Sequence, residues 1–290
     1  MKTVHNDVVK LTKTYIMNYR FSLILALCLC SDQPARADST MEYGVTQGES
    51  KPGKVQTVVI KDGKILIKDV GGNGKLDFIY SAKPEILFIV DHAKRSVMTL
   101  DENQVNQIAK QSEAVQPLLQ GFGEQVGKLD PAQRAKWEAM LGGKIHLDTI
   151  AEAAKPVQAG KIVKTGQTRK VAEIVCQPMT VWQGKEKTAE VCMAEPAKLN
   201  LSGPDYDTLR SLFDFLERVS SKTQVLAKQF GLNLPNLNLH EVSGVPIELR
   251  DLTNPGQGSL SMRRVVASAE SVDVMKVPDG YQFGPFKLWK

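Results

Sequence analysis

Two cysteines, Cys176 and Cys192, constrain the fold of this chain more than any other feature, because no other cysteine follows the N-terminal region. They lie in two strand-like runs, residues 171–182 and 187–194, on either side of a polar turn at Gly184. This pattern predicts a β-hairpin. Both cysteines lie eight positions from Gly184, so the hairpin places them opposite each other. Opposed residues have Cβ atoms about 4.5–5.5 Å apart, close to the span of a disulfide.

We therefore predict a disulfide between Cys176 and Cys192, formed in an oxidising compartment. It closes a loop of about fifteen residues, which contributes about 3 kcal/mol to stability in the chain-entropy model. A redox site would more often show a Cys-x-x-Cys motif at a helix start, and a metal site would need histidines near the cysteines. The sequence has neither. The pair thus predicts a structural bridge, and no cofactor is expected.

An uncharged apolar run over residues 21–30 indicates the compartment. The run is about half as long as a bilayer-spanning helix, and a basic residue precedes it. Residues 35–37 form a small-x-small cleavage motif. These features predict that residues 1–37 are a signal peptide, cleaved between Ala37 and Asp38. The mature chain is then exported, to the periplasm or the medium, and carries no transmembrane segment.

Three alternatives for this N-terminal region stay open. The gene start is Met1 or Met17, because a typical signal would begin at the second of these methionines. The apolar run is also compatible with a buried core segment. A lipoprotein signal requires a small residue before the lipidated cysteine, but leucine precedes both Cys28 and Cys30.

The charge of the chain argues against one class of partner. The formal net charge is +5, but residues 1–37 hold five of the 37 basic residues and two of the 32 acidic ones, which leaves +2 on residues 38–290. The remaining charges are mixed in sign, without the basic stripe that neutralises phosphates or an aromatic-interleaved RNA motif. We therefore expect no nucleic-acid partner.

Short strand-like runs separated by polar turns predict an antiparallel sheet rather than a doubly wound α/β fold. Residues 38–54 are polar and rich in Gly and Ser, so we expect a flexible N-terminal segment before a single α+β domain, residues 55–290. The predicted strands span residues 55–60, 64–68, 76–80, 85–90, 96–100, 161–164, 171–182, 187–194, 245–250, 259–266 and 272–277.

Helix signals fall between these strands. Asp101 is a candidate N-cap, with a glutamine three residues later at the reciprocal position of a capping box. Pro117 predicts a kink or break in the helix that follows. Asp130, followed by a proline and then by Gln133, starts a second helix. The clearest helix spans residues 204–230, with one apolar stripe that predicts packing against the sheet.

Motifs for catalysis, metals and nucleotides do not rise above background. The four histidines show no metal-ligand spacing; they are His5, His92, His146 and His240. The glycine runs lack the context of a phosphate or dinucleotide loop, and no Gly-x-Ser-x-Gly elbow occurs. Asp205 lies at a predicted helix start, where a carboxylate complements the helix dipole. We therefore expect the chain to be no enzyme and to hold no metal.

Residues 130–143, Asp-Pro-Ala-Gln-Arg-Ala-Lys-Trp-Glu-Ala-Met-Leu-Gly-Gly, resemble a helix of an uncharacterised bacterial exported family, known as a domain of unknown function. Segments 60–65, 89–91, 171–191 and 277–281 also resemble this family. Such domains are similar to the half-barrel of the lipoprotein carrier LolA, which implies a curved antiparallel sheet covering one or more helices. The family has no established catalytic residues to transfer. This chain departs from it in having fewer methionines around the central helix and a long later helix.

The leading hypothesis is an exported, non-enzymatic protein that holds a lipid, an acyl chain or another apolar ligand between the curved sheet and its helices. The candidate contacts are apolar residues of both layers: Phe78, Phe88, Leu212, Phe213 and Leu216. The alternative is a structural or interaction module of the cell envelope with a filled core and no small ligand. An enzyme is the third hypothesis. The sequence identifies no protein partner.

Overall fold

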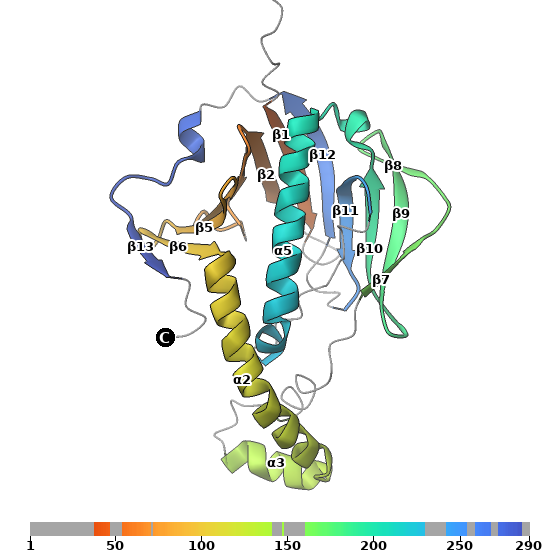
Figure 1. Ribbon diagram of the computed structural model, residues 1–290. Coiled ribbons are helices and arrows are strands. Elements are labelled where there is room, and N and C mark those ends of the chain that lie inside the picture. Colours follow the sequence, from red (N-terminus) through yellow and green to blue (C-terminus); the bar gives the residue numbers. More distant parts are fainter. Residues whose placement is uncertain are drawn as a thin grey trace, which may run out of the picture. The chain divides into compact units, whose positions relative to one another are not determined.

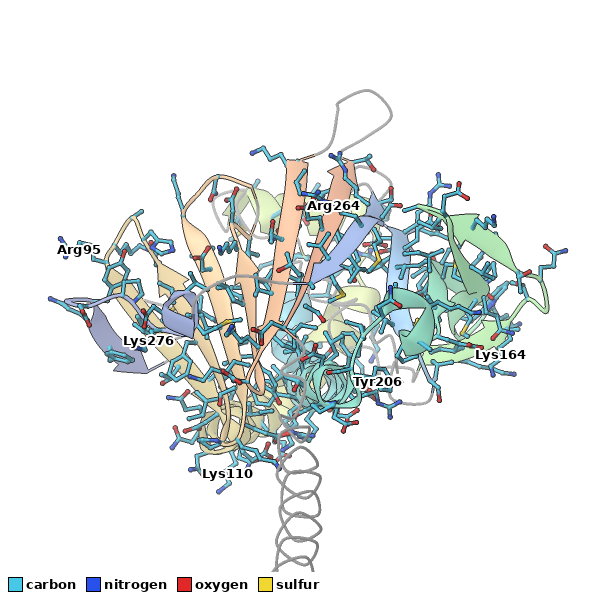
Figure 2. The ribbon with its side chains drawn as sticks, turned by 90° about the horizontal axis from the view of Figure 1, so that it is seen from above. Arg95, Lys110, Lys164, Tyr206, Arg264 and Lys276 are labelled. Carbon is cyan, nitrogen blue, oxygen red and sulfur yellow. A yellow bond between two sulfur atoms is a disulfide. The ribbon has the colours of Figure 1, made fainter. Side chains whose placement is uncertain are left out.

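The computed structural model describes residues 38–46, 54–70, 72–140, 147, 160–229, 242–253, 259–267 and 272–285, all of which belong to one compact unit, residues 37–290. The predicted signal peptide, residues 1–37, lies outside these described residues. The described part is α+β, with one large curved sheet whose two ends are not joined and long helices against one face (Figure 1). Seen from above, Arg95 and Lys164 mark opposite ends of the sheet (Figure 2).

The sheet has thirteen strands, and among the described pairs only β13 with β6 is parallel. The order across the sheet is β13-β6-β5-β4-β3-β2-β1-β12-β11-β10-β9-β7, and β8 pairs with β9 off this path. The strands are β1 (Ser39–Thr46), β2 (Lys54–Lys61), β3 (Lys64–Lys68), β4 (Leu76–Ala82), β5 (Glu85–Asp91), β6 (Ser96–Asp101), β7 (Gly160–Lys164), β8 (Arg169–Val171), β9 (Ile174–Gln183), β10 (Glu186–Ala194), β11 (Val245–Asp251), β12 (Ser259–Ala267) and β13 (Gln282–Pro285).

Strand β1 corrects the expectation of a flexible segment over residues 38–54. It pairs with β2 on one side and β12 on the other, and so joins the N-terminal meander to the C-terminal hairpin. Met41 and Tyr43 are buried in the main core. Most residues of β1 are buried, and its backbone groups have strand partners on both sides. Both features stabilise a strand whose polar residues alone suggest a loop.

Most other predicted strands are confirmed within a residue or two, with two exceptions. The predicted strand 171–182 is divided into β8 and β9 by a turn at Ala172 and Glu173, whose φ angles are positive at 47° and 63°. The predicted strand 272–277 is instead a 3-10 helix, η4 (Val272–Met275). Residues 272–281, here called the C-terminal strap, lead from η4 to β13.

The helix starts follow the predicted capping chemistry. α2 (Glu102–Gly127) is capped by Asp101, whose Oδ1 accepts a hydrogen bond of 2.8 Å from the Gln104 amide. α3 (Pro131–Met140) has a reciprocal box: Asp130 Oδ1 accepts from the Gln133 amide at 2.8 Å, and Gln133 Oε1 accepts from the Asp130 amide at 3.1 Å. A short 3-10 helix, η1 (Pro196–Leu199), precedes α5 (Gly203–Gln229).

The sequence predicted a kink or a break at Pro117, but the helix α2 does not end there. The helix continues through it to Gly127. Pro117 is exposed to solvent, so its ring displaces no packed neighbour, and the helix loses one backbone hydrogen bond that solvent can replace. α2 also packs along α5 (Figure 1), which supports it through tertiary contacts.

The predicted disulfide between Cys176 and Cys192 is present, with a Cα–Cα distance of 5.6 Å and both residues buried. The predicted register is wrong by two residues, because Cys192 pairs with Pro178. A bulge at Thr188 shifts the β9–β10 register between the turn and the cysteines. The bridge is therefore diagonal across the hairpin rather than between directly opposed residues.

The sheet buries apolar side chains on both faces. The main core lies between the inner face and helices α2 and α5, and it includes the disulfide. An outer cluster forms on the opposite face of β2–β6, where the C-terminal strap covers it. A third cluster covers the other end of the sheet; its buried members are Met179, Val181, Ala189, Val191, Met193 and Val242.

Candidate functional site

The five residues expected to contact an apolar ligand do not form one site. Leu212 is buried in the main core, and Phe78 and Phe213 are partly buried against that core. Leu216 is 42% exposed on α5. Phe88 lies on the outer face instead, where it pairs with Ile79 and packs in the outer cluster. Four of the five therefore lie on the helix side of the sheet, and the fifth does not.

Side chains of the protein fill the space between α5 and the sheet at this point. Phe215 is 0% exposed, and its ring centroid lies 5.6 Å from that of Tyr80. The Tyr80 hydroxyl and the Ser211 hydroxyl share a hydrogen bond of 2.6 Å. Burial raises the pKa of Tyr80, so its phenol stays protonated at neutral pH. The inner face at α5 is thus a packed aromatic and aliphatic layer.

A polar seam closes the edge of this layer. Arg218 of α5 lies 2.5 Å from Glu85, at the start of β5, and 3.7 Å from Glu102, at the start of α2. Lys222 donates to Glu102 Oε1 at 2.8 Å and to Asn106 Oδ1 at 2.7 Å. The hydrogen bond from Lys222 holds the pKa of Glu102 below its usual value. The seam joins both helices to the sheet.

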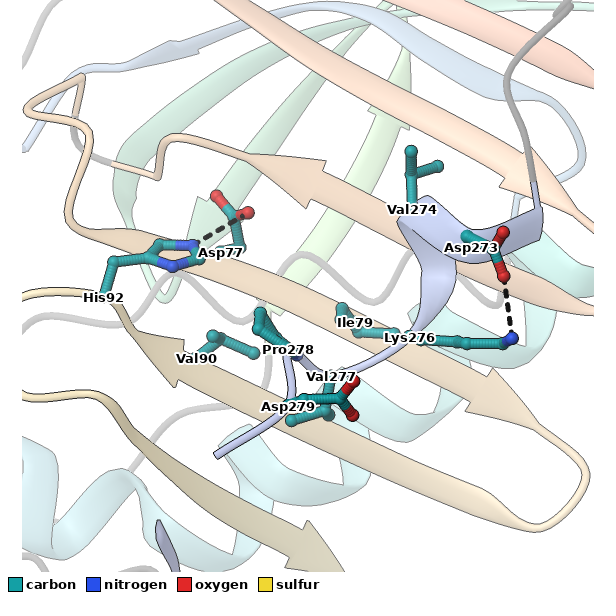
Figure 3. A pocket seen from close by; sticks show the side chains of 10 residues that line it. All are labelled: Asp77, Ile79, Val90, His92, Asp273, Val274, Lys276, Val277, Pro278 and Asp279. Atoms are coloured by element: carbon teal, nitrogen blue, oxygen red, sulfur yellow. Dashed lines mark hydrogen bonds and ion pairs between the residues drawn. The ribbon is translucent and has the colours of Figure 1, made fainter. Parts of the chain in front are cut away.

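The outer face carries a groove with a volume of about 440 Å³ (Figure 3). Its floor is the apolar surface of β4 and β5 at Ile79 and Val90. The C-terminal strap forms the opposite wall with Val274, Val277 and Pro278. The polar lining residues are Asp77, His92, Asp273, Lys276 and Asp279. The groove is therefore apolar at its base and charged at its rim.

One end of this outer groove is a hydrogen-bonded chain of three side chains. His92 Nε2 lies 3.1 Å from Asp77 Oδ2, and His92 Nδ1 lies 2.9 Å from the Tyr281 hydroxyl. Asp77 Oδ1 accepts from the Asp69 amide at 2.8 Å. The carboxylate only accepts, so Nε2 carries a proton and donates to Asp77, while Nδ1 shares a hydrogen bond with the Tyr281 hydroxyl. Both ring nitrogens are then occupied.

This chain fastens the C-terminal strap to the sheet. The His92 and Tyr281 rings meet edge to face at 5.8 Å, and the Arg95 guanidinium lies 5.9 Å from the Tyr281 ring centroid. The Gln282 amide donates to the Arg95 carbonyl at 3.0 Å, where β13 begins. These contacts thus join the strap to the end of the sheet formed by β4, β5 and β6.

The other end of the groove belongs to the strap alone. Asp273 and Lys276 form an ion pair of 2.7 Å, drawn in Figure 3, and Asp279 is exposed nearby. Three carboxylates and one lysine line the groove, so it can accept a small group with an apolar body and a positive end.

Sequence reasoning missed the contact between His92 and Tyr281, because these residues lie 189 positions apart and no local pattern connects them.

The predicted cleavage point lies beside the start of β1. Ala37 falls outside the described residues, whereas Asp38 is described and forms an ion pair with Lys61 of β2. The next residue, Ser39, donates to Asp205 Oδ2 of α5 at 2.8 Å. The predicted new N-terminus therefore lies against the start of α5.

In the part of the chain that the structure describes, no set of three or more His, Cys, Asp or Glu side chains gathers as metal ligands would. None of the described helices combines the length and apolar character that crossing a bilayer requires. Comparisons with models of known protein families and with curated proteins find no match.

Proposed function

We propose that this chain is an exported, non-enzymatic interaction module of the cell envelope, which acts through its surface rather than through a chamber between sheet and helices. The observation that carries this proposal is the packing of α5. Leu209, Leu212 and Phe215 are buried against the inner face, where a ligand held between the layers would lie. An acyl chain would have to displace these side chains, and emptying such positions typically costs about 2–5 kcal/mol each.

The structural contacts of His92 suit the non-enzymatic part of the proposal. Its ring nitrogens bind Asp77 of β4 and Tyr281 of the C-terminal strap, so the side chain joins two segments of the fold. The sequence features of residues 1–37 support export, and the buried bridge between Cys176 and Cys192 suits an oxidising compartment.

Apolar ligand binding is the second candidate function, and one observation favours it. Leu216 is 42% exposed and lies one helical turn after Phe213, which is partly buried. The two form a short apolar strip along the side of α5, at the edge of the packed layer. The resemblance to LolA-like half-barrels also supports this candidate. An acyl chain bound there would lie beside α5 rather than beneath it.

Native purification separates the two candidates. The protein is isolated from its own host under mild conditions, and its intact mass, its N-terminus and any extracted lipid are measured by mass spectrometry. We expect a chain that begins at Asp38, carries one disulfide and holds no stoichiometric lipid. A chain that keeps residues 1–37 and remains in the cytosol would contradict export.

A titration with a fluorescent fatty acid tests the side of α5 directly. The surface-module proposal predicts no saturable uptake by the unmodified chain. Saturable uptake that Leu216→Asp abolishes, and that the matched variant Val266→Asp on β12 leaves intact, would favour the second candidate instead. Both positions are exposed, at 42% and 40%, so neither substitution disturbs the core.

A further inference from the structure

A buried carboxylate, that of Asp205 at the start of α5, lies against the start of β1, and the contacts described for it include no positively charged group. Asp205 is 4% exposed and Ser39, which donates to it at 2.8 Å, is 5% exposed. The Ser202 hydroxyl accepts from the Asp205 amide at 3.1 Å. The partners recorded for the Asp205 carboxylate among the described residues are hydroxyls, which satisfy its hydrogen bonds but do not balance its charge.

A second carboxylate adds to this imbalance. Asp38 lies beside Asp205 closely enough that its charge raises the pKa of Asp205, in addition to the larger effect of burial. Lys61 is ion-paired with Asp38, and the side chains of both are largely buried at 11% and 14% exposure. The described part of the junction of β1, β2 and α5 thus brings together two carboxylates, one of which is ion-paired with Lys61.

Cleavage between Ala37 and Asp38 would change this balance. Hydrolysis of that peptide bond by a signal peptidase consumes one water and leaves a carboxylate on Ala37 and an α-ammonium on Asp38. Adjacent Cα atoms are about 3.8 Å apart, so the new ammonium lies one residue from Ser39, whose side chain already touches Asp205. The new ammonium therefore forms at the junction that holds the buried carboxylate.

We propose that the α-ammonium of mature Asp38 pairs with Asp205, so that removal of the preceding segment stabilises the folded unit. This inference rests on the cleavage position within the proposed function. The inference also goes beyond the proposed function, because cleavage would then stabilise the folded chain as well as release it from the signal peptide. The precursor keeps an amide at Asp38, and the partners of the Asp205 carboxylate within the described residues are then its hydroxyls.

A thermodynamic cycle tests the pairing on the predicted mature chain, residues 38–290, which lies within the compact unit. The chain is released from a fusion so that Asp38 carries a free amine, and it is compared with the same chain extended by Gly-Ser. We expect the free amine to lower the unfolding equilibrium constant about tenfold in urea titrations, as for a hydrogen bond between charged groups. Asp205→Asn should remove most of that difference, whereas Asp207→Asn, an exposed position on the same helical turn, should keep it.

A second measurement does not depend on a variant that folds. The pKa of the α-amine is measured by NMR titration of the chain with the free amine. The extended chain is titrated in parallel, so that signals of Asp38, Ser39, Lys61 and Ser202 can be compared with and without the free amine. The pairing predicts an α-amine pKa above its ordinary range of about 7.7–8.0. An ordinary value, or equal stability of the free and extended chains, would overturn the pairing. A host-derived N-terminus other than Asp38 would instead overturn the processing step on which it rests.

Discussion

The inner face of strands β2–β6 packs against the long helix α5, whereas the outer face of the same strands is covered by the short C-terminal strap. Alternate residues of one strand serve the two faces, as Ile60 and Val59 do in β2. The inner layer is held by a large apolar area. The outer layer has a smaller apolar cluster and depends on polar contacts such as His92 with Tyr281.

The two faces should differ in how easily their covering layers open to solvent. A layer built on buried apolar area opens only when the whole unit unfolds, because its contacts form together. A layer held by a short segment and a few hydrogen bonds opens locally at lower cost. We therefore expect the inner layer to determine global stability, and the outer strap and its groove to exchange with solvent more readily.

The largest effect is expected from Phe215→Ala on the inner face. Phe215 is fully buried and contacts Tyr80, so its truncation leaves a cavity in the main core. The expected loss is about 3–5 kcal/mol in the free energy of unfolding, measured by urea titration. Leu216→Ala, at the next and exposed position, is the control and should change stability by less than about 1 kcal/mol. Similar losses at both positions would mean that α5 is not packed as described.

Removal of the disulfide tests how far the inner layer depends on a covalent tie. Cys176→Ser with Cys192→Ser should lower the free energy of unfolding by about 3 kcal/mol, mainly because the unfolded chain gains freedom. The unmodified chain treated with a reductant provides the control, since it removes the same bond without changing composition. A double variant as stable as the oxidised chain would show that the apolar layer alone holds this end of the sheet.

Tyr281→Phe is expected to loosen the outer layer without affecting the inner one. It removes the hydroxyl that Nδ1 of His92 binds at 2.9 Å, at a cost of about 1 kcal/mol. Hydrogen exchange should accelerate in residues 272–285 and remain slow in β2–β6. Tyr206→Phe is the matched control, because the Tyr206 hydroxyl accepts from the Gly244 amide at 2.9 Å on the inner side. Equal exchange patterns in the two variants would remove the distinction between the faces.

The smallest effect concerns pH and the polar seam. Lys222 lowers the pKa of Glu102 in the folded chain relative to its usual value of 4.5. The resulting stabilisation is present above pH 4.5 and is lost as the pH falls through the lower folded-state pKa. Because Glu102 is about half exposed, we expect only a few tenths of a kcal/mol.

Glu102→Gln isolates this contribution of the seam. The variant should be slightly less stable than the unmodified chain at neutral pH and should match it in strong acid. Glu113→Gln, at an exposed position of the same helix, controls for the loss of one negative charge. If the loss of stability in Glu102→Gln were the same in strong acid as at neutral pH, the contribution of Glu102 would come from packing or neutral hydrogen bonds rather than from its charge.

Local sequence patterns predicted the helix starts, the hairpin with the disulfide and the apolar stripe of α5. The cap at Asp101, the reciprocal box at Asp130 and the hairpin that holds Cys176 and Cys192 depend on residues a few positions apart, or on one turn. The apolar stripe of α5 was recognisable because helical periodicity is a property of the segment itself. The details that failed there were local effects, such as the bulge at Thr188, which shifts the β9–β10 register by one residue between the turn and the cysteines.

The candidate site could not be predicted in the same way. Phe88 was assigned to the helix side, but the pleat of β5 directs it to the outer face with Ile79. Strand pairing determines the face, and an error of one residue exchanges the two faces. Tyr281 lies beside His92 where β13 pairs in parallel with β6, and these two residues are 189 positions apart in the sequence.

The sequence by itself determined the cysteine pair, the run of short antiparallel strands and the helix starts, because each depends on neighbours in the chain. Tertiary structure alone decided that β1 lies between β2 and β12, and that the strap closes the outer face. It also decided that Ser39 meets the buried Asp205 at a distance of 166 residues along the chain. These contacts form between segments whose own patterns are weak, so only the burial of the whole sheet selects them.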